Sequence, residues 1–327
     1  MTAYLGIDVS KDKLDIALIR DNQTPLVATF DNTRKGFHSL KNFLNKRKIT
    51  TLHACLEATG HYSDDIALFL HEQGFMVSVV NPARIKSYAD SRLRHQKTDT
   101  SDAMLIADFC RTQQPDVWTP PASEIIELQA LARHLDNLKT MRQQEINRRK
   151  AGIPSSTVLQ TLDDHILFLT KQIDDLENQI RDHINRHPQL KHQHDLLKTI
   201  PGIGDLTAYK LLAEIRDIHA FQDASQLVAF AGLHPTQRIS GTSVKTKPRL
   251  SKRGSTHLRV ALFFPAMVAK KHNPILAQFA RRLAEAGKCK KAVIGAVMRK
   301  LLHLVYGILK SGRPFDPHYL DNLAIPS

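Results

Sequence analysis

Alternating apolar and polar positions divide the first 80 residues into short strands and helices. Strands bounded by polar turns such as SKDK and DNQTP are predicted at 3–9, 14–20, 26–31, 51–56 and 76–80. Amphipathic helices are predicted at 35–45 and 64–72. The predicted order is therefore βββαβαβα, in which three antiparallel strands lead into alternating helices and parallel strands.

This order predicts an α/β domain built on a mixed sheet with helices on both faces. It is the plan of ribonuclease H-like (RuvC-like) domains, whereas other α/β folds usually begin with a βαβ unit. Pro115, Pro120 and Pro121 then interrupt the pattern. We therefore expect the first domain to span residues 1–122.

A long helical coiled-coil linker is expected over residues 123–195. Its pattern is charged and amphipathic from 124 to 149, is interrupted at 153–156 and then resumes. The apolar positions of the second part alternate in steps of three and four, which is a heptad seam: Leu159, Leu162, Ile166, Leu169, Ile173, Leu176 and Ile180. An antiparallel hairpin within one chain and a coiled coil between protomers both satisfy this seam.

The remainder, residues 196–327, is expected to be a mainly α domain with a glycine-rich, basic stretch between Gly232 and Gly254. Its motif IPGIGDLTAYKLLAEI resembles a helix-hairpin-helix turn. Backbone amides at such a turn can hold a phosphate, and Gly202 and Gly204 permit close approach of the backbone. An ordinary turn between two helices explains these residues equally well.

Composition favours a polyanionic partner. The chain has 46 Lys and Arg against 32 Asp and Glu, a formal charge of +14, and nucleic acid is the obvious candidate. Its three cysteines have neither zinc spacing nor the even number of a disulfide framework, which fits a reducing cytosol. No signal peptide is recognisable, and no apolar run approaches the roughly 20 residues of a membrane span. We expect a soluble, cytoplasmic protein.

Four acidic residues occupy positions where a metal site for phosphodiester chemistry could form. Asp8 lies inside the first strand, and Glu57 ends the fourth, which neighbours the first in this topology. Asp99 and Asp102 share a face at the start of a helix. Hard divalent ions prefer carboxylate oxygens, and two ions about 3.5 to 4 Å apart can neutralise a phosphate and activate a nucleophile.

Each of these residues also has an ordinary structural interpretation. Asp8 could belong to a turn, Glu57 and Asp99 could cap helices, and Asp102 could be a favourable charge in a first helical turn. The four together, on elements that converge at one edge of the sheet, form a more specific pattern than any one alone. We therefore interpret them as a metal-binding site.

Together with other motifs, these residues show that the chain resembles the DEDD transposases of bacterial insertion sequences, which are related to the Piv DNA invertases and are bridge-RNA-guided serine recombinases. The N-terminal motifs are GIDVSK, LEATG, VSVVNP and KTDTSDA. The C-terminal motifs are IPGIG, AFAGLHP, the SG after RIS, SKRG and KKAVIGAVMRKLL. The resemblance implies that Asp8, Glu57, Asp99 and Asp102 are the DEDD tetrad and bind Mg²⁺, with Mn²⁺ as an alternative.

The resemblance also implies that Ser240, in the SG motif, is the nucleophile that becomes covalently joined to a DNA end. From the residues alone a Ser-Gly dipeptide is an ordinary turn, and Ser243 and Ser251 are local rivals. Basic residues near Ser240 could neutralise a phosphate and the charge that develops on attack. These are Arg238, Lys245, Lys247, Arg249, Lys252 and Arg253.

The function that the resemblance implies is site-specific DNA recombination by the transposase of an insertion sequence, in the bacterial cytoplasm at the nucleoid. The implied partners are donor and target DNA, a guide (bridge) RNA and further copies of the chain in a dimer or tetramer, without a membrane. Two alternatives remain open on the residues alone. One is a RuvC-like structure-selective nuclease that uses the same carboxylates with water as nucleophile, and the other is a non-catalytic nucleic-acid-binding scaffold.

Overall fold

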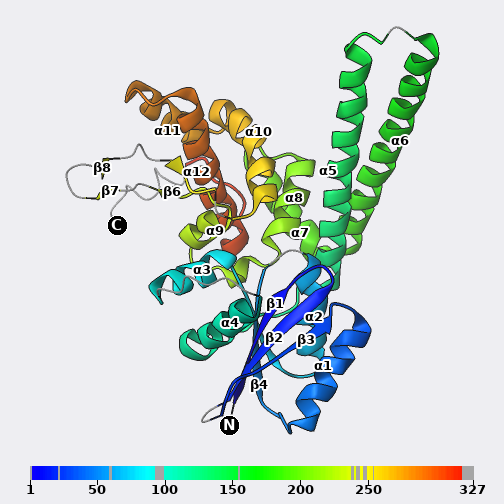
Figure 1. Cartoon of the computed structure of the whole chain (residues 1–327). Helices are drawn as coiled ribbons and strands as arrows, with labels where there is room; N and C mark the ends of the chain where they lie inside the picture. Colours follow the sequence, from blue (N-terminus) through cyan, green and yellow to red (C-terminus); the bar gives the residue numbers. More distant parts are fainter. Residues whose placement is uncertain are drawn as a thin grey trace. The chain divides into compact units, whose positions relative to one another are not determined.

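The computed structural model forms two compact units, Met1–Pro120 and Pro121–Ser327 (Figure 1). The residues that it describes are 2–20, 23–58, 61–92, 99–153, 155–236, 239–240, 244–245, 249–252 and 254–318. Within these ranges, only the backbone is described for residues 61, 83, 99–101, 239–240 and 244–245. We refer to the two units as unit 1 and unit 2.

Unit 1 is built on a five-stranded mixed sheet of order β3-β2-β1-β4-β5. Its strands are β1 (Ala3–Val9), β2 (Lys13–Ile19), β3 (Leu26–Asp31), β4 (Leu52–Glu57) and β5 (Met76–Val80). β2 runs antiparallel to both β1 and β3, whereas β1, β4 and β5 run parallel to one another. The predicted order of elements and the adjacency of the first and fourth strands are therefore confirmed.

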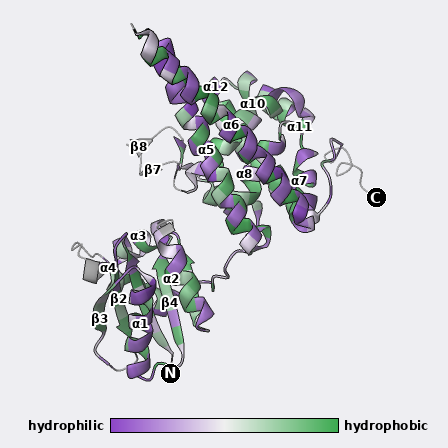
Figure 2. Ribbon diagram, turned by 90° about the vertical axis from the view of Figure 1, so that its right-hand side faces the viewer, coloured by the Kyte–Doolittle hydropathy of each residue, from purple (hydrophilic) through white to green (hydrophobic). Residues whose placement is uncertain are grey.

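Helices cover both faces of this sheet, so the predicted α/β architecture is confirmed as well. The helices of unit 1 are α1 (Arg34–Lys46), α2 (His61–Glu72), α3 (Pro82–Ser91) and α4 (Asp99–Gln113). On one face Leu5 and Ile7 of β1 join a core with Phe37 and Leu40 of α1 and Ile66 of α2. The other face packs against α4. In Figure 2 the strands are largely apolar and α1 is largely hydrophilic, as expected for a buried sheet under a surface helix.

Unit 2 begins with a long helical hairpin, which we call the arm. It consists of α5 (Ser123–Lys150) and α6 (Ser156–Arg186), which pack against each other (Figure 1). The seam predicted from the heptads faces inward in this chain, with Leu169, Ile173 and Ile180 almost fully buried. The hairpin alternative for the seam is therefore the one found, because α5 supplies the opposing apolar residues within the same chain.

The rest of unit 2 is helical apart from short paired strands. Its helices are α7 (Pro188–Lys198), α8 (Asp205–Ile215), the 3₁₀ turn η1 (Ile218–Ala220), α9 (Ala224–Phe230), α10 (Thr256–His272), α11 (Pro274–Glu285) and α12 (Lys290–Ser311). Its strands are β6 (Pro235–Thr236), β7 (Ile239–Ser240), β8 (Val244–Lys245) and β9 (Arg249–Leu250). By length and composition α12 is a described helix that could cross a membrane, but 50% of its apolar window is buried. It packs against α7, α9, α10 and α11, as a central core helix does.

Candidate active site

Asp8 and Glu57 lie on the same face of neighbouring strands. The parallel register of β1 and β4 pairs Gly6 with Cys55 and Ile7 with Leu56, so the next positions on the two strands are Asp8 and Glu57. Side chains at matching positions of parallel strands point to the same face of a sheet. Both carboxylate residues are half-buried at the C-terminal ends of their strands.

Helix α4 covers that face. A Cβ atom at Gly6 would overlap with the carbonyl oxygen of Ala103 and with the backbone nitrogen of Ala107, so β1 and α4 are in backbone contact. Near the other end of the helix, the Cys110 thiol donates a hydrogen bond of 3.5 Å to the carbonyl oxygen of His53, close to the start of β4.

These contacts fix the direction of α4. Ala103 lies beside Gly6, and Cys110 lies beside the start of β4, so the helix runs antiparallel to β1 and β4. Its N-terminal end is therefore directed toward the strand ends that carry Asp8 and Glu57. Asp99 is the first residue of the helix, described by its backbone only, and the half-buried Asp102 follows one turn later.

The described side chains test whether a metal ion fits here. Among them, no three His, Cys, Asp or Glu residues lie close enough together to hold an ion, and the side chain of Asp99 is not one of those described. The chemistry of the donor set nevertheless suits a hard divalent cation, because every expected ligand is a carboxylate.

A further carboxylate, which the sequence analysis missed, lies directly opposite Asp8. The antiparallel register of β1 and β2 pairs Asp8 with Asp15. Asp15 accepts a hydrogen bond of 2.5 Å from the Thr29 hydroxyl on β3. Like charges directly opposite each other in a sheet are unfavourable unless something compensates them. The polar SKDK turn was the available signal, because it fixes the register that pairs the two aspartates.

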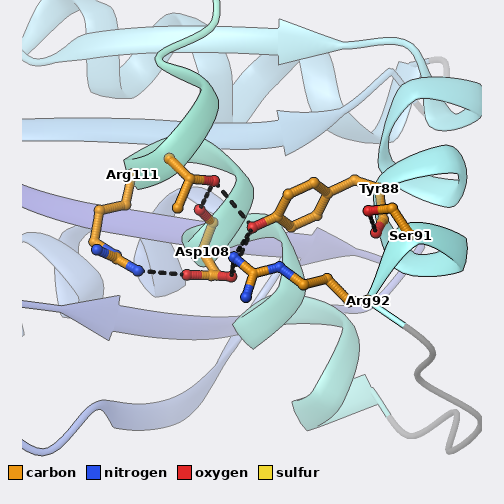
Figure 3. A network of polar contacts seen from close by, with 6 residues as sticks. Tyr88, Ser91, Arg92, Asp108 and Arg111 are labelled. Carbon is orange, nitrogen blue, oxygen red and sulfur yellow. Dashed lines mark hydrogen bonds and ion pairs between the residues drawn. The ribbon is translucent and has the colours of Figure 1, made fainter.

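A polar network also missed by the sequence analysis ties α3 to α4 (Figure 3). The Tyr88 hydroxyl donates a 2.7 Å hydrogen bond to Asp108, which also forms ion pairs with Arg92 at 3.1 Å and Arg111 at 2.8 Å. Burial by itself raises the pKa of Asp108, but the hydrogen bonds from Tyr88 and Arg111 and the charge of Arg92 lower it overall. The network therefore joins the end of α3 to the middle of the helix that begins at Asp99.

Two thiols lie beneath the candidate site. Cys55 on β4 and Cys110 on α4 are fully buried in one small cluster with Ile106 and Phe109. Hydrogen bonding with Cys110 and burial raise the pKa of the Cys55 thiol. Cys55 is therefore a neutral core residue, and the pair forms part of the contact that holds α4 on the sheet.

Ser240 belongs to a short β ribbon of unit 2, between α9 and α10. The ribbon consists of two antiparallel pairs of short strands: β6 pairs with β9, and β7 pairs with β8. Ser240 on β7 is the register partner of Val244 on β8. Its base is held by backbone hydrogen bonds from Ser251 to His234 and from Lys252 to Gly232. The side chain of Ser240 lies outside the described residues.

The rival serines and the basic residues of this segment are only partly described. Arg249 and Lys252 are exposed, the backbone of Lys245 is part of β8, and Ser251 is half-buried at the base of the ribbon. The predicted residues that lie outside the description are Arg238, Ser243, Lys247 and Arg253.

The two glycines of the IPGIG motif differ in their surroundings. They lie in the turn that joins α7 to α8. Gly202 has a φ of +108°, and a Cβ atom there would be 2.7 Å from the Cβ of Ala269 on α10, so its close approach is to a helix of its own unit. Gly204 has no neighbour within 4 Å of an added Cβ and is the N-cap of α8 without a side-chain cap. Of the two, Gly204 is the one open to a ligand.

Positive charge is concentrated in one segment of unit 2. Between residues 231 and 315 the sequence has 18 of the 46 Lys and Arg but only one acidic residue, Glu285, of the 32 Asp and Glu. The remainder of the chain therefore has 28 basic and 31 acidic residues. The whole excess of positive charge lies in the segment that contains Ser240, where a polyanion would be bound most strongly.

Comparisons with known proteins agree with this picture. Residues 5–154 match the family model of a transposase, the DEDD transposase of IS110 elements, and residues 194–281 match the model of the IS116/IS110/IS902 transposase family. The chain is 37% identical over 316 residues to a pilin gene-inverting protein of Moraxella bovis, covering 96% of this chain and 97% of that protein. It is 25% identical over 299 residues to the transposase for insertion sequence element IS1111A of Coxiella burnetii, covering 82% and 78%.

The fold, the basic segment and these similarities together define a DNA-rearranging enzyme. More specifically, the chain belongs to the IS110 family of DEDD transposases, to which the pilin gene-inverting proteins are also related. The family assignment and the enzyme class expected from the sequence motifs are therefore confirmed.

Proposed function

We propose that the protein is a site-specific recombinase of an insertion sequence, with a RuvC-like catalytic unit that binds magnesium and a serine nucleophile. The observation that carries this proposal is the parallel register that brings Asp8 and Glu57 to one face, together with α4 packed over that face. Asp99 and Asp102 at the start of α4 complete the proposed set of ligands. Mn²⁺ would satisfy the same oxygen donors.

The proposed chemistry is a transesterification. Magnesium held by Asp8, Glu57, Asp99 and Asp102 would neutralise charge at the phosphate and lower the pKa of the attacking hydroxyl. The Ser240 oxygen forms a bond to phosphorus as the bond from phosphorus to the oxygen of the other DNA end breaks. The serine proton is transferred to that oxygen, which leaves as a hydroxyl, and the remaining DNA end is covalently joined to the protein. Because one phosphodiester replaces another, rejoining needs only the reverse reaction with a hydroxyl from a different DNA end. Basic residues of the ribbon, such as Arg249 and Lys252, would stabilise the charge that develops.

In this mechanism, three regions of the chain have different roles. Residues 1–122 would hold the metal, residues 123–195 would form the arm and residues 196–327 would carry the nucleophile. A serine hydroxyl is a weak nucleophile until a base or a metal activates it. The proposal therefore requires the carboxylates of the same copy or of another copy to act together with Ser240.

The nucleic-acid partners proposed for the basic segment are donor DNA, target DNA and a guide (bridge) RNA. Its large excess of Lys and Arg over Asp and Glu supports binding to phosphates without base recognition. The open Gly204 at the N-terminus of α8, in a helix-hairpin-helix-like turn, adds backbone amides as phosphate donors. We further propose that the enzyme acts as a homo-oligomer in the bacterial cytoplasm, at the nucleoid.

The test is a recombination assay with purified protein, its guide RNA, donor and target DNA and Mg²⁺. We expect recombinant DNA and a protein–DNA adduct that survives denaturation. Ser240→Ala should abolish the adduct, while Ser243→Ala, a matched change in the same segment, should retain it. The Asp8→Ala variant should lose the adduct and the recombinant product together.

The other outcomes separate the alternatives. Cleavage that survives Ser240→Ala but is lost in Asp8→Ala would mean a metal-dependent nuclease with water as nucleophile. Unchanged function in Asp102→Ala would mean that the carboxylates only support a binding scaffold. Either result would overturn the proposed serine mechanism.

A further inference from the structure

Between Val260 and Ala269, helix α10 is apolar around its whole circumference. One side, with Leu258, Leu262 and Ala266, is buried in the core of unit 2. The opposite side has large apolar residues exposed at helical spacing, and these are Val260 (62% exposed), Phe263 (41%), Phe264 (72%), Met267 (42%) and Val268 (47%). We call these five residues the α10 stripe. A helix that is apolar all round is normally covered on all sides, and Figure 2 shows α10 as apolar over most of its length.

The charges at the ends of the α10 stripe restrict what can cover it. Lys271 is exposed one turn after Met267 and Val268, and Lys270 precedes it. Helix α10 contains Arg259 but no Asp or Glu. If α10 packed against α10 of another copy, like charges would face each other in either orientation, which is unfavourable. The charges therefore favour an apolar helix with acidic residues beside its contact face.

The arm provides such a helix. On the outside of α6, Leu167 is 71% exposed and Phe168 is 59% exposed. The exposed Asp164 lies one turn before them on the same side, and the exposed Lys171 lies one turn after them. Helix α6 contains six acidic and three basic residues, so it is acidic in a chain that is basic overall. We call Asp164, Leu167 and Phe168 the arm face.

The arm face and the α10 stripe belong to the same unit, and both are exposed in it. The arm of one chain therefore does not cover its own α10. Contact between the two faces requires a second copy of the chain.

We propose that the arm face of one copy docks on the α10 stripe of a second copy. If the helices cross antiparallel, with Leu167 and Phe168 against Met267 and Val268, then Asp164 lies opposite Lys271. Two-fold symmetry makes the same contact twice, so the pair is closed and does not grow into a filament. A single helix crossing is small beside the roughly 1,600 Å² of a standard interface, so the two contacts act together. This dimer surface depends on neither the metal site nor Ser240.

Cross-linking tests which faces meet. The full-length chain is prepared with Cys289→Ser, because Cys289 is exposed whereas Cys55 and Cys110 are buried. A Phe168→Cys chain and a Met267→Cys chain with a tag of different length are mixed and oxidised, because the antiparallel docking places Phe168 opposite Met267. We expect a disulfide-linked heterodimer in the mixture. The control replaces the second chain with Val27→Cys, an exposed apolar position in unit 1.

Each other outcome of this experiment counts against the proposal. Heterodimer no more abundant than in the Val27→Cys control would show that the two faces do not meet. Homodimer of Met267→Cys in excess of heterodimer would show that α10 pairs with itself. Homodimer of Phe168→Cys in excess would show that the arms pair with each other.

Charge reversal tests the predicted orientation. We expect Lys271→Glu to weaken self-association by about tenfold in sedimentation equilibrium, and Asp164→Lys in the same chain to restore it. Lys35→Glu, an exposed change in unit 1, should have no effect. Loss without rescue would contradict the antiparallel docking. Phe264→Gln that weakens nucleic-acid binding without changing self-association would make the α10 stripe a nucleic-acid surface instead.

Discussion

Gly6 on β1 lies against Ala103 on α4 so closely that no side chain fits between the two backbones. This contact sets the distance between α4 and the sheet. Asp8 lies two residues after Gly6 on the same face, and Asp102 directly precedes Ala103. The smallest residue in the first strand therefore determines how near the proposed metal ligands of strand and helix come to each other.

Gly6→Ala should displace α4 from the sheet. Because the neighbouring atoms are backbone and not a flexible side-chain end, we expect a loss of about 1–3 kcal/mol or more in the free energy of unfolding of unit 1. The yield of the protein–DNA adduct should fall by more than the loss of folded protein accounts for. Denaturation followed by the fluorescence of Trp118, the single tryptophan, reports unit 1. Gly307→Ala, at a helical glycine of α12 in unit 2 with nothing within 4 Å of an added Cβ, is the control and should cost no stability when unfolding is followed by the circular dichroism of the helices.

Glu57→Gln should remove a proposed metal ligand without changing side-chain volume. We expect at least a 10- to 100-fold loss of adduct formation and weaker Mn²⁺ binding, measured by electron paramagnetic resonance. The fold should persist, because Glu57 is the last residue of β4. Glu72→Gln, an exposed change at the end of α2, should leave both quantities unchanged. Normal metal binding in Glu57→Gln would remove this residue from the proposed site.

Asp108→Asn should make unit 1 less sensitive to acid. Because the folded-state pKa of Asp108 is below its ordinary value of about 3.9, the carboxylate stabilises the folded state above about pH 4, and this contribution is lost as the pH falls through the folded pKa. We expect the variant to lose about 1–2 kcal/mol at pH 7, and the difference from the wild type to be smaller at pH 3. Urea unfolding at the two pH values measures this. A stability difference between variant and wild type that is the same at both pH values would contradict this prediction. Asp90→Asn, an exposed change in the same unit, is the control.

Gly202→Ala should lower the stability of unit 2, whereas Gly204→Ala should affect nucleic-acid binding and leave stability nearly unchanged. Gly202 combines a positive φ with close contact to Ala269, so alanine there should destabilise unit 2 by about 2–4 kcal/mol. Gly204 has open space and a negative φ, so alanine there should change stability little. If the turn binds phosphate, Gly204→Ala should weaken RNA or DNA binding in a filter assay. Unchanged binding in a folded Gly204→Ala variant would assign the turn a purely structural role.

Neutralising the basic ribbon should reduce the salt dependence of nucleic-acid binding. If Arg249 and Lys252 each neutralise one phosphate, Arg249→Ala or Lys252→Ala should lower the slope of log affinity against log salt by about one. Titrations of labelled DNA and RNA at several salt concentrations measure the slope. Lys35→Ala in unit 1 is the control of equal charge change. A slope that falls equally in all three variants would place the interface elsewhere.

Most strands and helices of unit 1 could be predicted from the local periodicity of apolar residues. The predicted bounds of its strands and of α1 and α2 lie within three residues of those observed, because alternation every two residues and every three to four residues reports which side of an element is buried. The neighbouring positions of Asp8 and Glu57 followed from topology, since the fourth strand of this plan lies beside the first. Their role as metal ligands stays a prediction.

Other features could not be predicted from local pattern. Asp15 was overlooked because its place opposite Asp8 depends on strand register, and a shift of one residue would move it to the other face. Tyr88 and Asp108 lie on separate helices, so their hydrogen bond exists only after α3 and α4 pack. The glycines of the IPGIG motif looked alike in sequence but differ in their neighbours.

The sequence by itself determined the order of elements, the concentration of basic residues after position 231 and the motifs that identify the family, because each of these is local or compositional. Only the tertiary structure decided that the heptad seam of α6 is satisfied by α5 of the same chain, that β1 touches α4 at Gly6, and that α10 has an uncovered apolar side. Those features depend on which surfaces meet, and residues distant in the chain meet only when the whole set of apolar faces is buried together.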